Sequence, residues 1–198
     1  MGKHGSQYAR VERDLYPTPD WVVGALVEHV DLCGLRIWES ACGDGRMAEA
    51  LKTHGASTYA TDIAGDYAEE LFDFCSPGFP KGLGVPDGIV TNPPFSRANS
   101  FVDMGLTRIA SGGFLALLLP TDFDSAVGRR RFFHDCPFFC ARIVLTKRIV
   151  WFARSDGERA QPKENHAWFI WQRPVMRGRL PIVRYAPVIE KGANYGRA

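Results

Sequence analysis

The sequence contains few cysteines and no closely spaced pair of them. The five cysteines are odd in number and include no Cys-x-x-Cys pair: Cys33, Cys42, Cys75, Cys136 and Cys140. Neither a disulfide framework nor a zinc ribbon is therefore indicated, and we expect reduced, mostly buried thiols. His134 lies close to two of these cysteines, but the intervening Pro-Phe-Phe residues are typical of packing, so we predict no metal site.

Long apolar runs are also missing. No segment approaches the roughly 20 apolar residues that a membrane-spanning helix requires. Residues 1–6 lead into charged residues rather than into the apolar core of a signal peptide. Internal repeats and low-complexity segments are absent as well. The sequence therefore predicts a cytoplasmic protein that does not bind a membrane.

Length and composition indicate one globular domain. The 198 residues are enough for one sizeable core and too few for two ordinary domains. With 45% hydrophobic and 23% charged residues, the composition is that of a folded protein. We predict a single domain over residues 1–198, with flexible segments at residues 1–15 and 194–198. A monomer and a homodimer both remain open.

Charge is distributed unevenly, although the formal net charge is only +2. Residues 1–99 contain 8 Lys and Arg against 14 Asp and Glu, whereas residues 100–198 contain 16 against 8. A basic second half is compatible with a polyanionic partner such as nucleic acid. It is equally compatible with an arginine-rich, solvated surface.

Hydrophobic spacing predicts an alternation of strands and helices. Helices are expected over residues 20–30, 46–54, 98–109 and 126–134. Strands are expected over residues 35–39, 57–61, 89–91, 113–119, 141–146 and 167–172. This order predicts a Rossmann-like α/β fold with a doubly wound, mostly parallel, seven-stranded sheet whose last two strands form an antiparallel edge hairpin. The long basic segment between those strands, residues 147–166, suggests function or mobility.

A glycine-containing turn follows the first predicted strand. In a βαβ unit such glycines let a ligand approach the backbone, and an acid ending the second strand accepts hydrogen bonds from ribose hydroxyls. Gly43, Gly45 and Asp62 supply these features. Residues 43–48 also match the G-x-G-x-x-A form of a nicotinamide dinucleotide site.

Two further acids argue against a dinucleotide. Glu39 ends the first strand and Asp44 lies inside the turn, so the pocket would repel a pyrophosphate. S-adenosylmethionine carries an ammonium and a sulfonium but no phosphate, and it suits such a pocket better. Helix capping would explain either acid alone, but it explains both together with Asp62 less well.

A second motif, Thr91-Asn92-Pro93-Pro94-Phe95, follows the strand predicted at residues 89–91. Each proline fixes its own φ and pushes the preceding residue towards extended geometry. The two prolines therefore hold the amide and the aromatic ring rigidly, as a functional site requires. Simple turn punctuation is the competing interpretation.

With both motifs considered, the chain resembles the class I S-adenosylmethionine-dependent methyltransferases. The resemblance is closest to the amino-methylating branch with an Asn/Asp-Pro-Pro-aromatic motif, including small DNA adenine-N6 methyltransferases of phages and prophages. It rests on Tyr16-Pro17-Thr18-Pro19, the turn from Glu39 to Gly45, Thr61-Asp62-Ile63, Asp73-Phe74 and Asn92-Pro93-Pro94-Phe95, in family order.

This resemblance implies S-adenosylmethionine as cofactor and assigns roles to individual residues. The implied cofactor-binding residues are Tyr16, Thr18, Pro19, Glu39, Ala41, Gly43, Asp44, Gly45, Asp62, Ile63, Asp73 and Phe74. The implied catalytic residues are Asn92, Pro93, Pro94 and Phe95. Ile63 is expected against the cofactor adenine, and Asp73 at its amino group.

The Asn-Pro-Pro-Phe motif suits methylation of an amino or amide nitrogen, whose lone pair is normally delocalised. The side-chain oxygen of Asn92 and the main-chain carbonyl of Pro93 would each accept one N–H, which favours a tetrahedral nitrogen. Phe95 would stack on a planar substrate. No general base is evident, so the proton would leave to solvent. A base within a duplex would have to flip out of the helix.

The predicted target is adenine N6 in DNA, with relaxed or short-site specificity because little of the chain remains for a recognition region. Candidate phosphate contacts are Arg129, Arg130, Arg131, Lys147, Arg148, Arg154, Arg159 and Lys163, with Trp151 and Phe152 available to stack on bases. The open alternatives are an RNA base amino methyltransferase, a protein glutamine methyltransferase, a nicotinamide-dependent oxidoreductase and a non-catalytic nucleic-acid adaptor.

Overall fold

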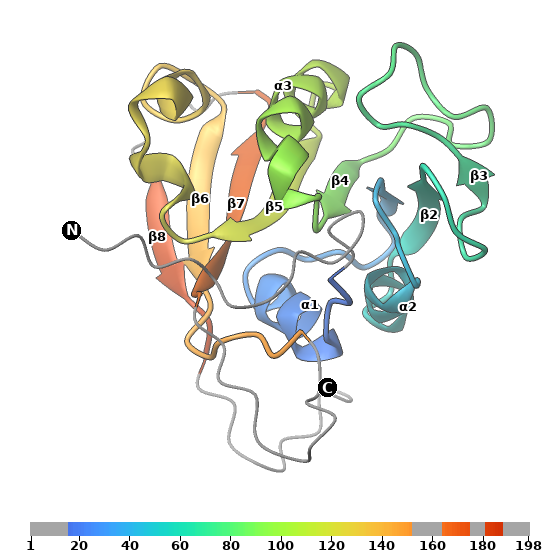
Figure 1. Ribbon diagram of the computed structural model, residues 1–198, viewed down its shortest axis with the longest axis horizontal. Coiled ribbons are helices and arrows are strands. Elements are labelled where there is room, and N and C mark those ends of the chain that lie inside the picture. Colours follow the sequence, from blue (N-terminus) through green and yellow to red (C-terminus); the bar gives the residue numbers. More distant parts are fainter. Residues whose placement is uncertain (1–15, 152–163, 175–180, 188–198) are drawn as a thin grey trace.

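The computed structural model describes residues 16–151, 164–174 and 181–187 (Figure 1). The segments predicted to be flexible, residues 1–15 and 194–198, lie outside these ranges. None of the helices in the described ranges has the length and apolar character of a membrane span. All five cysteines are free thiols as predicted, but only Cys42 is buried, so the expectation of mostly buried thiols is wrong.

One sheet of eight strands forms the centre of the molecule, in the order β3-β2-β1-β4-β5-β7-β6-β8. The strands are β1 (Arg36–Glu39), β2 (Ser57–Asp62), β3 (Glu70–Leu71), β4 (Gly88–Thr91), β5 (Phe114–Pro120), β6 (Phe139–Val144), β7 (His166–Gln172) and β8 (Ile182–Tyr185). The first five strands in this order, β3, β2, β1, β4 and β5, are each parallel to their neighbours. β7 runs antiparallel to both β5 and β6. The predicted α/β class and mostly parallel sheet are confirmed.

The sheet has one strand more than the seven predicted, because two short strands, β3 and β8, join the six whose positions the sequence indicates. β3 has only two residues, too few for a periodic pattern. β8 pairs in parallel with β6 and forms the outer edge. The antiparallel hairpin of β6 and β7 is therefore present, but it lies one strand inside the edge.

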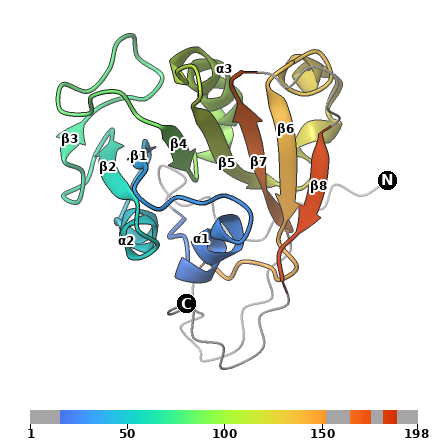
Figure 2. The same cartoon turned by 180° about the vertical axis from the view of Figure 1, so that it is seen from behind.

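The helices divide between the two faces of the sheet. Helices α1 (Asp20–Val27) and α2 (Arg46–Thr53) cover one face, and α3 (Ala98–Arg108) covers the other (Figures 1 and 2). Central strands contribute alternate side chains to the two cores. The core beneath α1 and α2 includes Ile37, Val90, Leu118 and Trp168, and the core beneath α3 includes Trp38, Ile89, Leu117 and Phe169. β5 contributes to both, which explains its continuous apolar run.

The basic helix predicted over residues 126–134 is not an α-helix. Two short 3-10 helices, Phe123–Ser125 and Val127–Phe132, occupy this region. Their inward rings, Phe123 and Phe132, are buried in the core beneath α3. The segment is therefore shaped by tertiary packing rather than by helical periodicity.

The strand directions bring the predicted motifs to one edge of the sheet. Parallel β1, β2 and β4 end at this edge with Glu39, Asp62 and Thr91. Because β7 runs antiparallel, it begins at the same edge, where His166 pairs with Pro120 of β5. This topology places the glycine turn, the Asn-Pro-Pro-Phe motif and the first residue of β7 together.

Candidate active site

A cavity of about 560 Å³ opens at the carboxyl ends of β1, β2 and β4. Its volume lies within the range of small-molecule sites. Ten of the twelve predicted cofactor residues line it: Tyr16, Thr18, Glu39, Ala41, Gly43, Asp44, Asp62, Ile63, Asp73 and Phe74. Pro19 and Gly45 are not among the lining residues. Asn92 and Pro94 of the second motif line the same cavity, whereas Pro93 and Phe95 do not.

Eight lining residues were not predicted from the sequence. They are Pro17, Ser40, Cys42, Met47, Ala64, Gly65, Arg97 and Phe101. Pro17, Ser40, Cys42 and Ala64 are immediate neighbours of predicted residues, so the motifs themselves point to them. Met47 and Phe101 instead belong to helices α2 and α3, where an apolar residue facing a cavity has the same sequence pattern as one facing the core.

The glycine turn is shaped by close packing and by Asp62. Gly45 has φ +84°, and a Cβ at this position would lie 2.3 Å from the ring of Tyr67. Asp62 accepts hydrogen bonds from the backbone nitrogens of Gly43 at 2.9 Å and Ala64 at 3.1 Å, one on each carboxylate oxygen. Each oxygen keeps a lone pair for a ligand hydroxyl. Gly45 therefore sets the path of the turn without lining the cavity.

Glu39 is a buried acid with one unused oxygen. Its side chain is 1% exposed, and Oε1 accepts hydrogen bonds from Ala41 N and Thr91 Oγ1. Oε2 has no hydrogen-bond partner among the described residues. Burial raises the pKa of Glu39 to about 8, against the lowering effect of its two hydrogen bonds. An orphaned acidic oxygen in a cavity wall suits a cationic or hydrogen-bond-donating ligand.

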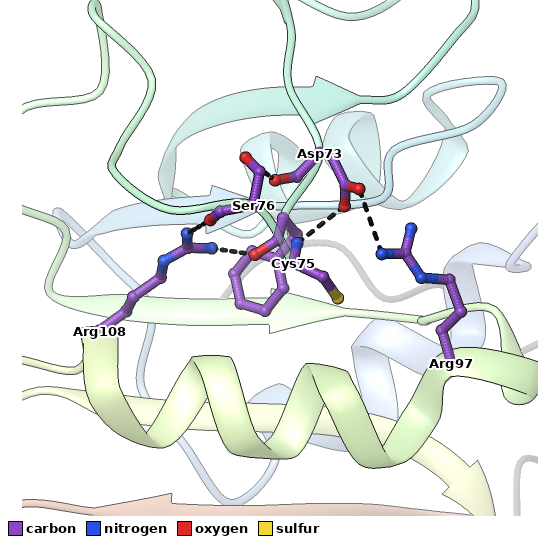
Figure 3. A network of polar contacts seen from close by, with 6 residues as sticks. Asp73, Cys75, Ser76, Arg97 and Arg108 are labelled. Atoms are coloured by element: carbon purple, nitrogen blue, oxygen red, sulfur yellow. Dashed lines mark hydrogen bonds and ion pairs between the residues drawn. The ribbon is translucent and has the colours of Figure 1, made fainter.

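A polar network holds the Asp73-Phe74 segment against α3 (Figure 3). Asp73 accepts hydrogen bonds from Cys75 N at 2.8 Å and from Arg97 at 3.1 Å. Burial alone would raise the pKa of Asp73, but these two donors lower it overall. Arg108 donates to the carbonyls of Phe74, Ser76 and Gly78.

Arg108 is the anchor of this segment, and the sequence patterns did not single it out. It is 6% exposed at the end of α3, and its guanidinium lies 4.7 Å from the ring centre of Phe74. Three carbonyl acceptors and a stacked ring compensate the burial of its charge. The contact depends on chain folding over more than 30 positions, so no local pattern signals it.

Asn92 is oriented by two acceptors that precede α1. Its Nδ2 donates to Tyr16 O at 3.2 Å and to Thr18 Oγ1 at 3.1 Å. A carbonyl oxygen accepts only from the NH₂ end of the amide, so the orientation of the side chain is fixed. Oδ1 is buried and has no hydrogen-bond partner among the described residues. The site thus presents a free amide oxygen beside the cavity.

Four rings next to this amide form what we call the aromatic cluster: Tyr16, Phe95, Trp151 and His166. The Phe95 ring is stacked on Tyr16, with centroids 5.5 Å apart at 21°, and on His166, 5.5 Å apart at 28°. Trp151 contacts His166 edge-on at 5.2 Å and Tyr16 at 5.3 Å. Phe95, which was expected to stack on the substrate, therefore has protein rings stacked on it in this structure.

The predicted phosphate contacts are largely engaged within the protein. Arg129 hydrogen bonds to Asn99 and Phe123 O, Arg130 pairs with Asp135, and Arg131 pairs with Asp103 of α3. These contacts attach the 3-10 segment to its surroundings. Of the other candidates, Lys147 lies over the ring of Trp21 and Arg148 hydrogen bonds to Asn165. The remaining basic candidates, Arg154, Arg159 and Lys163, and the proposed stacking residue Phe152 lie outside the described residues.

Comparison with known proteins identifies the fold. No protein-family model and no curated protein sequence matches the chain. A solved structure from Pyrococcus horikoshii, described as an RNA methyltransferase, has a TM-score of 0.59 at 14% identity and covers 85% of this chain and 91% of its own. A Listeria monocytogenes structure described as a class I S-adenosylmethionine-dependent methyltransferase has a TM-score of 0.57 at 12% identity. The match covers 92% of this chain and 67% of that one.

A third similar structure is described as a modification subunit of a type I restriction enzyme, from Vibrio vulnificus YJ016. Its TM-score is 0.55 at 16% identity, and the match covers 80% of this chain but only 44% of that one. Identities this low relate folds rather than activities. The sheet order, the two helical faces and these neighbours together show that the chain has the fold of the class I S-adenosylmethionine-dependent methyltransferases.

Proposed function

We propose that this protein transfers a methyl group from S-adenosylmethionine to an exocyclic amino nitrogen, with adenine N6 in DNA as the target and a short or relaxed recognition site. One observation carries the proposal. Asn92 holds both amide hydrogens on Tyr16 and Thr18 and leaves a buried, unpartnered Oδ1 beside the cavity. A fixed acceptor of this kind is what a substrate N–H requires.

The cavity residues fit the proposed cofactor. Four acidic side chains line the cavity, from Glu39, Asp44, Asp62 and Asp73, whereas the one arginine among its described lining residues, Arg97, is paired with Asp73. Such a wall attracts a cationic nucleoside and repels a pyrophosphate, which disfavours a nicotinamide dinucleotide.

The fit extends to the parts of the cofactor. Asp62 retains acceptor capacity for ribose hydroxyls, and the buried Oε2 of Glu39 lacks a donor. Ile63 is 53% exposed at the cavity, and a bound adenine would cover this apolar side chain. Asp73 is held at the same wall by Cys75 N and Arg97, so its carboxylate is positioned for an amino group.

When bound, S-adenosylmethionine supplies an electrophilic methyl group on a sulfonium. The residues of this chain prepare the nucleophile. Asn92 Oδ1 and the carbonyl of Pro93 accept the two N–H groups of the target, which withdraws the nitrogen lone pair from conjugation and directs it. Since Asn92 is already held by two hydrogen bonds, little reorganisation accompanies the reaction. The proton is released after methyl transfer, when the nitrogen is strongly acidic.

The aromatic cluster supports a planar substrate over a flexible glutamine side chain. Rings of this kind stack with any base, and a stacking site among partly buried rings is reached by a base that is unpaired or flipped out. Two of the similar structures are themselves described as an RNA methyltransferase and a restriction-enzyme modification subunit, which makes nucleic acid the first substrate to test.

The proposal is tested in two stages. Calorimetric titration with S-adenosylmethionine and with NAD compares the two cofactors, and only the former is expected to bind. Labelled methyl transfer is then measured on DNA, RNA and protein fractions in parallel, with the label expected on adenine in DNA. Binding of NAD alone would contradict the assignment of S-adenosylmethionine as cofactor. Label confined to the protein fraction would contradict the assignment of DNA as substrate.

A further inference from the structure

His166 is a buried polar residue whose side chain is poorly satisfied by the described part of the chain. It is 1% exposed, and neither ring nitrogen has a hydrogen-bond partner among the described residues. Burial lowers the pKa of His166 to about 4, against the opposing effects of the Glu164 backbone and the Asp122 charge, so the ring is neutral near pH 7. A buried imidazole with two unpaired nitrogens costs free energy, which calls for an explanation other than packing.

The fold explains why a histidine at this position meets the second motif. β7 is antiparallel to β5, so its first residue lies at the edge where β1, β2 and β4 end. There the imidazole covers one face of Phe95, while Tyr16 is also stacked on that ring. The main chain of Tyr16 anchors the Asn92 amide, so two ring residues, Phe95 and Tyr16, connect His166 to the proposed amino-group acceptor.

A base that stacks on Phe95 in place of the imidazole must turn His166 aside. The imidazole is tethered to β7 and moves only by rotation about its side-chain bonds, which brings the ring to the edge of the incoming base. A neutral imidazole carries one N–H donor and one acceptor nitrogen. In adenine, the ring nitrogens N1 and N7 are acceptors on either side of the N6 amino group, and Asn92 and Pro93 already account for the N6 hydrogens.

We propose that His166 is a substrate-binding residue that covers Phe95 in the free protein and, when the target base replaces it there, donates a hydrogen bond to a ring nitrogen beside the methylated amino group. This inference rests on the proposed methyltransferase function and deepens it. The ring nitrogens, which lack a hydrogen-bond partner among the described residues, gain one in the complex, so part of the free energy spent on burying them is recovered on binding. The residue thereby favours a heteroaromatic target over a glutamine side chain, which has no ring nitrogen.

The test combines a protein variant with altered bases. His166→Phe keeps a flat ring on Phe95 and removes both nitrogens, while His166→Asn keeps a donor and an acceptor. The substrates are single-stranded oligodeoxynucleotides that carry adenine, 1-deazaadenine or 7-deazaadenine at the methylated position. His29→Phe, in an exposed position after α1, is the matched control.

For adenine, kcat/KM should fall roughly 10- to 100-fold in His166→Phe, because the ring nitrogen of the base is then buried without a donor, and less in His166→Asn. For the wild-type protein, replacing adenine by one of the two deazaadenines should lower kcat/KM by a similar factor. For His166→Phe, the same replacement should leave kcat/KM unchanged. S-adenosylmethionine affinity should not change. The melting temperature of His166→Phe should be equal or higher, because an unpaired buried polar group has been removed.

Three results would overturn the inference. The first is a kcat/KM for adenine in His166→Phe equal to that of the wild-type protein. The second is a decrease in kcat/KM on replacing adenine by a deazaadenine that is as large in His166→Phe as in the wild-type protein. The third is methyl transfer by the wild-type protein to protein only, or to no fraction, despite S-adenosylmethionine binding. Failure of the wild-type protein to bind S-adenosylmethionine is a different outcome, because it removes the proposed function itself. If His166→Phe does not fold, His166→Asn and the deaza bases on the wild-type protein decide the question.

Discussion

The side-chain nitrogen of Asn92 donates a hydrogen bond to the Thr18 hydroxyl at 3.1 Å, although the two residues are 74 positions apart in sequence. This contact joins the segment before α1 to the end of β4 and determines which way the Asn92 amide points. The Tyr-Pro-Thr-Pro segment therefore has a second role beside lining the cavity. It aims the amide oxygen that we assign to the substrate.

Asn92→Ala should abolish methyl transfer and leave S-adenosylmethionine affinity nearly unchanged. The variant removes the acceptor for the substrate N–H but none of the acids that line the cavity. Loss of one preorganised hydrogen-bonding group at a reacting centre typically costs about 100- to 1000-fold in kcat. Single-turnover transfer of labelled methyl and calorimetric titration measure the two effects separately. Turnover at the wild-type rate would remove Asn92 from the proposed mechanism.

Thr18→Val should give a smaller effect of the same kind. Valine retains the shape of threonine but cannot accept a hydrogen bond, so the Asn92 amide is held only by Tyr16 O. A single neutral hydrogen bond contributes about 0.5–1.5 kcal/mol, so kcat should fall by roughly 2- to 12-fold. Thr18→Ser, which keeps the hydroxyl, is the matched control. A loss in Thr18→Ser as large as that in Thr18→Val would contradict the role assigned to the hydroxyl.

Arg108→Met should destabilise the protein and weaken cofactor binding together. The substitution leaves three carbonyls of the segment after β3 without their donor, and it also removes the charge above Phe74. We expect a loss of about 2–4 kcal/mol in the free energy of unfolding, as for other disrupted buried networks. Urea denaturation measures that loss, and calorimetry measures the affinity for S-adenosylmethionine.

Arg97→Met provides the contrast for stability. Its ion pair with Asp73 is substantially exposed, with side chains 37% and 41% accessible, and such pairs contribute about 0–1 kcal/mol. If both arginine variants lost the same stability, the anchoring role assigned to Arg108 would be wrong.

Local patterns in the sequence were sufficient for the central fold and for most of the cavity. The apolar run of β5, the amphipathic helices and the two motifs each lie in contiguous residues, so their chemistry is visible without a structure. Since parallel strands end at one edge, strand order alone was enough to bring Glu39, Asp62 and Asn92 together. β3 was not predicted because two residues carry too little pattern, and β8 was not predicted because none of its four residues is fully buried, unlike most of those in the equally short β1 and β4.

Contacts between distant segments were not predictable in the same way. Arg108 and His166 look like a helix-end arginine and a strand-start histidine, and only their surroundings reveal an anchor and an unpaired imidazole. Arg129, Arg130 and Arg131 are a further example. The run of basic residues predicts phosphate binding, which stays a prediction, but it gives no sign of the protein acceptors Asn99, Asp135 and Asp103, which lie elsewhere in the sequence.

The pKa of Glu39 predicts how stability depends on pH. Its ordinary value of 4.5 is raised to about 8 in the folded protein, so between these values the folded state keeps a proton that the unfolded state releases. The free energy of unfolding should therefore fall as the pH rises towards 8, by up to about 1.4 kcal/mol per pH unit, and this contribution should level off above pH 8. The range from pH 6.5 to 8 is the informative one, because the lowered pKa of His166 acts only below its ordinary value of 6.5.

Glu39→Gln isolates this effect, because glutamine keeps an oxygen acceptor for Ala41 N and Thr91 Oγ1 but cannot ionise. Urea denaturation at pH 6.5 and pH 8.5 should show a smaller decrease in stability for Glu39→Gln than for the wild-type protein. The affinity of the variant for S-adenosylmethionine at pH 8.5 should be lower, since the cation loses a buried carboxylate partner. Parallel pH profiles for the two proteins would show that Glu39 does not titrate in this range, and the acidic wall would then have to attract the cofactor through Asp44, Asp62 and Asp73 alone.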